Sequence, residues 1–387
     1  MSVCHIAKST AGGAVTVPPS KSYAHRLLIA AYLSGGKTTV SNVDLSNDIR
    51  ATIDCLKAIE AKGTLDCRES GSTLRFLIPV AIALNGGGRF TGTAKLFSRG
   101  IGEYEKIFKD QDIKYELSED SLTVDGRLSG GIYQIDGSTS SQYITGLLFA
   151  LPLLGGDSEI WITPPVQSRP YIDITMDVIH KAGIKARMDG NHIFITGGQS
   201  YNLPDCSVEG DWSNAAFLDI YNYLGGDVSL QGLNPDSLQG DKKYRELFRR
   251  LDAGWCEIDL GNCIDLGPVL FTLAAIKHGA RFINTARLRI KESDRVADIA
   301  GELTKAGATA VIGDNSVEIK PIPASRRATL SGEGIVFDSH NDHRLAMSLT
   351  ALATLFGARL KGCESVAKSF PGFFDTIKQL GIEVKDE

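Results

Sequence analysis

Short stretches that combine lysine or arginine with serine lie where apolar segments of the chain begin. The first of them is Pro18-Pro19-Ser20-Lys21-Ser22-Tyr23-Ala24-His25-Arg26, which runs into the apolar residues 27–33 and then Gly35-Gly36. Ser20 is a favourable N-cap, and the glycines favour the left-handed end of a helix. Lys21 and Ser22 then fall in the first turn, where free amides and the helix dipole attract anions. Taken alone, this helix is more simply explained as an amphipathic helix with two solvated cations.

Two further helix entrances repeat the arrangement, which favours anion binding over the simpler explanation. Glu69-Ser70-Gly71-Ser72-Thr73-Leu74-Arg75 offers amides, hydroxyls and an arginine one turn later, a combination that suits a phosphate or carboxylate. The stretch 136–142, which contains Ser140, Ser141 and Gln142, is rich in hydroxyls; it predicts either a phosphate or polyol site or a flexible capping loop. Arg99 and Ser168-Arg169 lie in or near loops and are weak signals by themselves.

The second half of the chain adds carboxylates to the cations. Asp265 precedes an apolar segment, the run Arg287 to Arg295 contains Lys291 and Glu292, and two later stretches carry Arg344 and Lys368. Cations beside two carboxylates suit acid–base chemistry on polyanionic reactants. The alternative for the run 287–295 is a solvated helix start with a Glu292–Arg295 pair three residues apart. We expect no metal, because no third ligand accompanies His340 and His343, and no cofactor, because no dinucleotide, Walker or nucleophile-elbow motif occurs.

Composition narrows the class of protein. The 387 residues carry a net charge of −5 without a Lys/Arg block, which argues against nucleic-acid binding. The first residues show no apolar signal region, and the longest apolar run, 144–154, is broken by Pro152. We therefore expect a cytoplasmic protein that does not enter a membrane. The seven cysteines lack any Cys-x-x-Cys spacing and are interpreted as reduced packing residues.

An internal repeat organises the whole chain. Six apolar helical segments begin with small polar or acidic residues and end at glycine, and a β-branched run follows each of them. The segments are Ser20–Gly36, Ser70–Gly87, Ser140–Gly156, Ser213–Gly226, Asp265–Gly279 and Asn341–Gly357. A more polar helix comes next in each repeat, at Asp48–Ala61, Tyr104–Lys109, Tyr171–Lys181, Lys243–Leu251, Ser293–Lys305 and Phe373–Leu380. A strand or strand pair completes the repeat, with hairpins expected in repeats two, three and five and shortened ends in repeats one and four.

The repeats predict two α/β lobes of three repeats each. We expect one lobe over 21–209 and the other over 1–20 and 210–387, because a polar break at Pro18 to Ser20 separates the first strand from the first helix. The apolar helices are hydrophobic nearly all round, so they should be buried at the centre of each lobe. Their polar N-termini are expected to emerge together and to form an electropositive cleft between the lobes.

Several motifs follow one another along the chain: Pro19-Ser-Lys-Ser-x-x-x-Arg26, Gly137-Ser-x-Ser-Ser-Gln142, Ser168-x-Pro-Tyr-Ile-Asp-Ile-Thr175, Leu238-Gln-Gly-Asp241, Lys291-Glu-Ser-Asp-Arg295, Asn341-Asp-His-Arg344 and Lys368-Ser-Phe-Pro371. In this order they make the chain similar to the enolpyruvyl transferases and above all to the 5-enolpyruvylshikimate-3-phosphate (EPSP) synthase family. The resemblance implies a two-lobed inside-out α/β barrel of six helix-strand-helix-strand repeats. It also implies transfer of the enolpyruvyl group of phosphoenolpyruvate to shikimate-3-phosphate by addition and elimination, in the route to chorismate and the aromatic amino acids, by an enzyme that we expect to be monomeric.

The resemblance also implies roles for individual residues. The ligands of shikimate-3-phosphate would be Lys21, Ser22, Arg26, Ser140, Ser141, Ser168, Asp265 and Lys291. Those of phosphoenolpyruvate would be Lys21, Gly71, Arg99, Gln142, Arg295, Arg344 and Lys368. Asp265 would accept the proton of the attacking hydroxyl, Glu292 would give and later remove the C3 proton, and Lys21 would reach both ligands. Glu69, Gly100, Ile264 and Arg287 depart from the family pattern, so no role is carried over to them.

Two other functions stay open at the level of the sequence. The related UDP-N-acetylglucosamine enolpyruvyl transferases share the repeats, but that family places a reactive cysteine in the loop that corresponds to Thr91–Tyr104, where this chain has none. A non-catalytic protein that closes on an anionic sugar phosphate would need the helix entrances but neither Asp265 nor Glu292.

Overall fold

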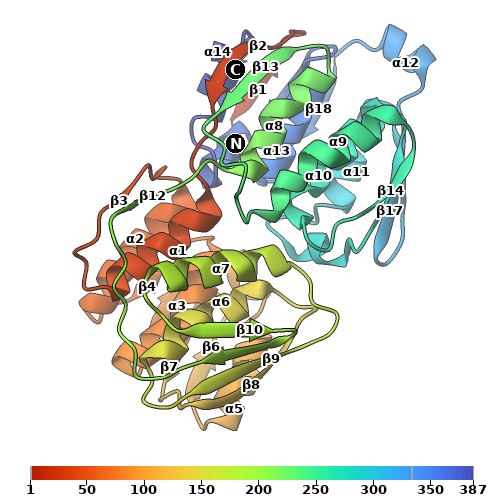
Figure 1. Ribbon diagram of the computed structural model, residues 1–387. Coiled ribbons are helices and arrows are strands. Elements are labelled where there is room, and N and C mark those ends of the chain that lie inside the picture. The colour runs from red at the N-terminus through yellow and green to blue at the C-terminus, as the bar shows by residue number, and fades with distance from the viewer. Residues whose placement is uncertain (1, 333, 387) are drawn as a thin grey trace. The chain divides into compact units, whose positions relative to one another are not determined.

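The computed structural model describes residues 2–332 and 334–386 and separates into two compact lobes (Figure 1). The first lobe runs from Lys21 to Glu209, and the second combines the residues up to Ser20 with those from Gly210 onward. Each lobe is a mixed α/β structure with its own buried core.

In the first lobe, every expected helix is present. Its helices are α1 (Lys21–Leu33), α2 (Asn47–Glu60), α3 (Gly71–Asn85), α4 (Ala94–Ser98), α5 (Gly102–Asp110), α6 (Ser141–Ala150), the 3-10 turn η1 (Leu151–Leu153) and α7 (Arg169–Lys181). Its strands are β3 (Val40–Ser41), β4 (Leu65–Asp66), β5 (Gly87–Thr91), β6 (Lys114–Leu117), β7 (Ser121–Asp125), β8 (Gly131–Asp136), β9 (Ser158–Thr163), β10 (Ala186–Asp189), β11 (His192–Ile195) and β12 (Cys206–Ser207). Gly35 and Gly36 have φ of 80° and 69°, which confirms the left-handed end predicted for the first helix.

The second lobe repeats this pattern. Its helices and turns are α8 (Trp212–Tyr223), η2 (Gly240–Lys243), α9 (Tyr244–Ala253), η3 (Ile264–Leu266), α10 (Gly267–Ile276), η4 (Ala286–Ile290), α11 (Ala297–Lys305), α12 (Ala324–Thr329), α13 (His343–Ala353), η5 (Cys363–Lys368) and α14 (Phe373–Gln379). Its strands are β1 (Val3–Ile6), β2 (Gly12–Thr16), β13 (Asp227–Gln231), β14 (Cys256–Asp259), β15 (Ala280–Ile283), β16 (Thr309–Ile312), β17 (Ser316–Lys320), β18 (Val336–Asp338), β19 (Ala358–Lys361) and β20 (Val384–Asp386).

The sheets show the internal repeat most clearly. Four sheets have one topology, in which the first pair of strands is parallel and the next two pairings are antiparallel: β4-β5-β7-β6, β8-β9-β11-β10, β14-β15-β17-β16 and β18-β19-β1-β20. Hairpins occur in repeats two, three and five, as the sequence predicts. The short strands of repeats one and four, β4 and β14, pair in parallel with the first strand of the next repeat, so neither needs a hairpin partner of its own.

The apolar helices form the centre of each lobe. In the first lobe α3 packs against α6, and in the second α8, α10 and α13 pack against one another, while the sheets lie outside them (Figure 1). All residues of α10 from Gly267 to Ile276 are buried. The helix has no polar face, so burial of every side removes the most apolar surface from water and is the most favourable in free energy. The burial predicted for these helices is confirmed.

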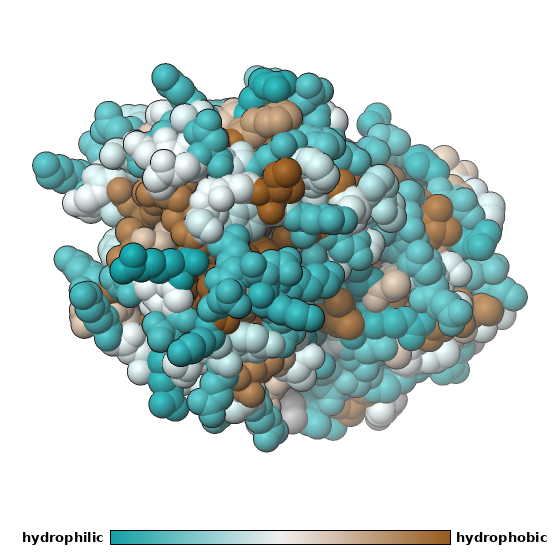
Figure 2. All heavy atoms as spheres, turned by 90° about the horizontal axis from the view of Figure 1, so that it is seen from below, coloured by the Kyte–Doolittle hydropathy of each residue, from teal (hydrophilic) through white to brown (hydrophobic). Residues whose placement is uncertain are grey.

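The surface drawn in Figure 2 is largely hydrophilic, and its hydrophobic side chains form separate patches. The large apolar residues exposed by more than a third include Ile132, Trp161 and Trp255, which come from different strands or loops. Ile132 and Trp161 lie on the paired strands β8 and β9 and line one surface hollow, whereas Trp255 lies in a loop of the other lobe. Among the described residues, no helix combines the length and hydropathy required to span a bilayer.

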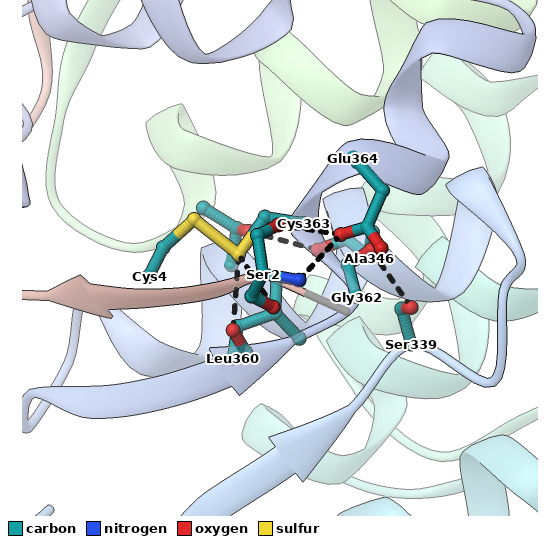
Figure 3. The surroundings of a disulfide bond; sticks show 9 residues. Ser2, Cys4, Ser339, Ala346, Leu360, Gly362, Cys363 and Glu364 are labelled. Atoms are coloured by element: carbon teal, nitrogen blue, oxygen red, sulfur yellow. Dashed lines mark hydrogen bonds between the residues drawn. A yellow bond between two sulfur atoms is a disulfide. The ribbon is translucent and has the colours of Figure 1, made fainter. Parts of the chain in front are cut away.

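The expectation that all seven cysteines are reduced is wrong for two of them. Cys4 on β1 and Cys363 at the start of η5 form a disulfide with a Cα–Cα distance of 6.3 Å (Figure 3). The two cysteines are 359 positions apart in sequence, so their spacing could not predict the bond. The sheet brings them together, because Cys4 lies on β1, which pairs with β19, and Cys363 follows β19 in the chain. Cys55, Cys67, Cys206, Cys256 and Cys263 are free thiols.

Candidate active site

The side chain of Arg295 is the centre of a cluster in the second lobe. It is 1% exposed, and its guanidinium donates to three carboxylates: Nε to Asp342 at 2.7 Å, Nη1 to Asp265 at 3.0 Å and Nη2 to Glu292 at 2.7 Å. Burial alone would lower the pKa of Arg295. The negative charges of Asp342, Glu292 and Asp265 outweigh this effect and raise the pKa above its usual value. The alternative of a solvated helix start for this segment is therefore wrong.

The helix predicted from Ser293 begins four residues later, at Ala297. The carboxylate of Asp294 accepts from the amides of Val296 and Ala297 and so holds the turn that precedes the helix, whose N-cap is Val296. Lys291 and Glu292 consequently lie on a non-helical segment that Arg295 anchors.

Three positively charged side chains surround the carboxylate of Asp265. It lies in η3, and its side chain, 19% exposed, is within 3.0 Å of Arg295, 3.1 Å of Arg344 and 3.4 Å of Lys291. Glu292 has the same exposure, 19%, and lies 2.7 Å from Arg295. Both carboxylates that the sequence singled out are thus brought together through Arg295.

Lys291 has an unusual environment for an amine. Its pKa is lowered to about 8, chiefly by burial, while the negative charge of Asp265 opposes the shift. An ammonium with such a pKa is mostly charged at neutral pH and loses its charge under mildly alkaline conditions.

Asp342 and its neighbours position two further cations. Asp342 is fully buried and caps α13 by accepting from the amide of Arg344 at 2.9 Å. Arg344 donates to the hydroxyl of Ser213 at 2.6 Å. Lys368, at the end of η5, donates to the backbone carbonyl of Asn341 at 2.6 Å, which places its ammonium beside the same helix entrance.

Asp241 is a further carboxyl close to the three carboxylates of this cluster. It is 5% exposed, and burial, followed by the negative charge of Asp265, raises its pKa to about 7. Arg344 and Ser213 are neighbours that favour its charged form. The sequence motif 238–241 contained this residue, but nothing in the motif assigned it to the cluster.

In the first lobe, two arginines and a glutamine gather around Gly71. A Cβ atom on Gly71 would lie 2.9 Å from Nη1 of Arg75 and 3.0 Å from Nη1 of Arg99, so only glycine leaves both guanidiniums in place. Arg75 donates to Gln142 at 3.2 Å and to the carbonyls of Arg99 and Gly100 at 3.2 and 2.7 Å. Two positive charges at a helix N-terminus make this an anion-binding arrangement.

Gly100 contributes to that arrangement through its backbone. Its φ of 71° lies in the left-handed region, where a residue with a side chain is strained. In this conformation its carbonyl accepts from Arg75 and, at 3.2 Å, from the hydroxyl of Tyr143. The departure from the family pattern at this position therefore has a defined structural use.

The first entrance is held by contacts inside the first lobe. Lys21 donates to Asp48 at 2.8 Å. Arg26 is 3% exposed and donates to Thr175, Thr145 and the carbonyls of Ser22 and Tyr171, and burial lowers its pKa to about 10. Arg26 therefore joins α1 to α6 and α7.

The hydroxyl residues lie where the sequence predicts them. Ser140 caps α6 by accepting from the amide of Gln142 at 3.3 Å, and Ser141 is the first residue of that helix. Ser168 is buried at the start of α7 with φ of 57°. Sequence reasoning expected Arg75 to favour an anion but assigned it to neither substrate, and it gave Asp342 no role. Arg75 makes three hydrogen bonds beside Gly71, and Asp342 bonds both Arg295 and the amide of Arg344. The available signal for Asp342 was an acid directly before His343-Arg344.

The comparisons with known proteins agree along almost the whole chain. The sequence profile of the family EPSP synthase (3-phosphoshikimate 1-carboxyvinyltransferase) matches residues 7–65, 59–259 and 253–377. The chain belongs to the EPSP synthase family.

Members of the EPSP synthase family resemble the chain in sequence as well as in fold. The 3-phosphoshikimate 1-carboxyvinyltransferase of Clostridium kluyveri is 40% identical and covers 97% of this chain and 96% of its own length. That of Clostridium perfringens is 38% identical, with 99% of each chain covered. The EPSP synthase structure from Acinetobacter baumannii superposes with a TM-score of 0.77 at 21% identity over 100% of both chains.

The fold expected from the sequence is confirmed by the superposition on an EPSP synthase. The chain has the two-lobed inside-out α/β fold, with six repeats of helix and strand, three per lobe. The relatives are named for the shikimate enzyme, so the UDP-N-acetylglucosamine alternative is not favoured.

Proposed function

We propose that the chain is a 3-phosphoshikimate 1-carboxyvinyltransferase (EC 2.5.1.19). It transfers the enolpyruvyl group of phosphoenolpyruvate to the 5-hydroxyl of shikimate-3-phosphate and releases phosphate, a step of chorismate and aromatic amino acid biosynthesis. The observation that supports this most strongly is that one buried guanidinium, that of Arg295, holds both Asp265 and Glu292. A protein that only bound anions would have no use for two carboxylates fixed among its cations.

The reaction follows from two proton transfers. Asp265 accepts the proton of the attacking hydroxyl as its oxygen bonds to C2 of phosphoenolpyruvate, and Glu292 gives a proton to C3. The C2–O bond to phosphate then breaks, Glu292 removes a proton from C3 to restore the double bond, and Asp265 returns its proton to the leaving phosphate or to solvent. No covalent bond to the protein and no cofactor is needed in this sequence.

We propose that the cationic side chains of the chain neutralise the two anionic substrates. We assign phosphoenolpyruvate to Lys21, Gly71, Arg99, Gln142, Arg295, Arg344 and Lys368, and shikimate-3-phosphate to Lys21, Ser22, Arg26, Ser140, Ser141, Ser168, Asp265 and Lys291. The guanidiniums beside Gly71 and the ammonium of Lys368 beside the entrance of α13 support the first set. Hydrogen bonds to the phosphate and carboxylate groups strengthen as charge develops in the transition state. Lys21 serves both substrates and counts with Asp265 and Glu292 among the catalytic residues.

Arg295 joins the two proposed proton carriers. Its guanidinium donates to Asp265 at 3.0 Å and to Glu292 at 2.7 Å, so one buried side chain fixes the positions of both carboxylates.

A phosphate-release assay tests the function directly. We expect phosphate to appear from phosphoenolpyruvate when shikimate-3-phosphate is present and not when UDP-N-acetylglucosamine replaces it. Release with the nucleotide sugar would support the related transferase, and no release with either acceptor would support the binding protein. We further propose that the enzyme is cytoplasmic and monomeric and acts on these small molecules without nucleic acid; fractionation and light scattering would test the first two statements.

A further inference from the structure

Four polar side chains form an unbroken line through the interior of the first lobe. His25 on α1, Thr52 on α2, Thr73 on α3 and Ser70, the N-cap of α3, are each no more than 1% exposed. His25 Nδ1 lies 2.7 Å from Thr52 Oγ1, which lies 2.7 Å from Thr73 Oγ1, which lies 2.7 Å from Ser70 Oγ. None of the four carries a role in the function proposed above.

The direction of these hydrogen bonds can be worked out from one end. Thr73 donates its hydroxyl proton to Ser70, and the backbone carbonyl of Asp48, 3.4 Å from the same Thr73 oxygen, can only accept. A hydroxyl has a single proton, so Thr73 has to accept from Thr52. Thr52 has then used its own proton and accepts from Nδ1 of His25.

The imidazole is placed to be that first donor. Its ring packs edge-on against Phe76 with the ring centres 6.2 Å apart. Burial, together with the positive charges of Lys21 and Arg26, holds the pKa of His25 well below its usual value, so the ring is neutral and carries one proton. Among the described residues no group bonds Nε2, whereas Nδ1 has Thr52.

The other end of the line is the entrance that contains Gly71. Ser70 Oγ accepts from the hydroxyl of Thr73 and from its amide at 3.2 Å, so the serine rotamer is fixed from two sides. The first amides of a helix have no partner within the helix and point out of its end. At this helix the guanidiniums of Arg75 and Arg99 lie beside Gly71, the first helical residue.

We propose that His25, as the neutral Nδ1–H tautomer, starts a one-way relay of hydrogen bonds through Thr52 and Thr73 to Ser70, and that this relay positions the entrance of α3 for phosphoenolpyruvate. The tautomer and the direction of the relay stand on the structure alone; the identity of the ligand rests on the proposed function. These four are positioning residues, since none of them touches a substrate. The relay also joins α1, which carries Lys21, to α3, which carries Gly71.

Kinetics of Thr52 variants test the positioning role. Thr52→Val keeps the shape of the side chain and removes the hydroxyl, whereas Thr52→Ser keeps the hydroxyl and removes the methyl group. We expect Thr52→Val to raise the KM for phosphoenolpyruvate about tenfold while the KM for shikimate-3-phosphate changes less than about twofold, the size of effect typical of a lost buried hydrogen bond. Thr52→Ser should restore the KM for phosphoenolpyruvate. Equal behaviour of the two variants, or equal changes in both KM values, would overturn the positioning role.

A matched control separates the relay from general effects on the core. Thr272 on α10 is fully buried, and its hydroxyl has no hydrogen-bond partner among the described residues. Thr272→Val makes the same chemical change without breaking a relay, so both KM values should stay at the wild-type level. A rise in the KM for phosphoenolpyruvate in Thr272→Val comparable to that in Thr52→Val would count against the relay.

The tautomer gives a readout that does not depend on activity. Imidazole ¹⁵N chemical shifts distinguish Nδ1–H from Nε2–H, and the His25 signals are identified by their absence in His25→Gln. The relay predicts Nδ1–H in the wild type. Nε2–H or a charged ring in the wild type overturns the proposal even in a fully active enzyme. If instead Nδ1–H is found and no phosphate is released in the assay, the relay stands and the proposed function fails.

Discussion

Arg295 and Asp342 form an ion pair in which neither side chain reaches the surface. Nε and Oδ2 are 2.7 Å apart, and the two side chains are 1% and 0% exposed. Asp342 also caps α13, and Arg295 also holds Asp265 and Glu292. One carboxylate therefore anchors both the helix that carries Arg344 and the guanidinium that orients the two proposed proton carriers.

Removal of the charge of Asp342 should damage both activity and stability. Asp342→Asn keeps a helix cap but leaves Arg295 without its most buried partner, and the loss of one partner of a buried pair costs about 3–5 kcal/mol. We expect the free energy of unfolding in urea to fall by that amount and kcat to fall with it. Ser293→Ala, which removes a neutral hydroxyl that bonds Asp342 at 3.3 Å and also bonds Asp298, is the control and should cost about 1 kcal/mol. An Asp342→Asn variant as stable as the wild type would contradict the anchoring role.

Glu292→Gln should separate binding from chemistry. The amide oxygen of glutamine still accepts from Arg295, so both substrates should bind, but no proton reaches C3. We expect kcat to fall by about 10²–10⁴-fold with KM values near those of the wild type. Glu257→Gln, at an exposed pair with Arg281, serves as the control. Unchanged turnover in Glu292→Gln would remove this residue from the mechanism.

Gly71→Ala should weaken phosphoenolpyruvate binding without unfolding the lobe. The new methyl group would press on the guanidinium ends of Arg75 and Arg99, which can move because they are the far ends of long side chains. Overpacking of this kind costs about 1–3 kcal/mol, so we expect the KM for phosphoenolpyruvate to rise by about tenfold or more. Gly301→Ala is the matched control, since a Cβ there meets no atom within 4 Å and should stabilise α11. Equal KM values in the two variants would show that the arginines tolerate the methyl group.

The charge of Lys291 should set an alkaline limit on shikimate-3-phosphate binding. Its pKa of about 8 means that the ammonium is present below pH 8 and is lost as the pH rises above that value. We expect kcat/KM for shikimate-3-phosphate to fall between pH 7.5 and about 9 in the wild type. Lys291→Arg keeps its charge over this range, so its profile should be flat there. The same fall in the arginine variant would assign the limit to another group.

The Cys4–Cys363 disulfide should stabilise the second lobe. A cross-link that ties the N-terminal strand to η5 restricts the unfolded chain, and such bonds typically contribute about 2–4 kcal/mol. We expect the midpoint of urea unfolding to fall when the protein is reduced, and Cys4→Ser to unfold at that lower midpoint with or without reductant. Cys206→Ser, which removes a free thiol, should leave the redox difference intact. Seven reactive thiols in the denatured, unreduced wild type would mean that the bond is absent.

The sequence by itself determined the local elements and the family. The glycine stops and polar entrances of the six apolar helices depend only on neighbouring residues, because caps and left-handed ends are local events. The motifs around Lys21, Glu292 and Arg344 were sufficient for the fold and for the choice of candidate residues, since each combines residue type with fixed spacing.

Only the tertiary structure decided which of these residues meet. Arg295, Asp265 and Asp342 are distant in sequence, and their ion pairs exist because η3, α13 and the loop before α11 come together in the second lobe. The same holds for the line from His25 to Ser70, which crosses three helices, and for Cys4 and Cys363, which the pairing of β1 with β19 brings together. Contacts between side chains that are distant in sequence depend on how the helices and sheets pack together. A local sequence pattern carries no information on that packing and therefore could not predict these contacts.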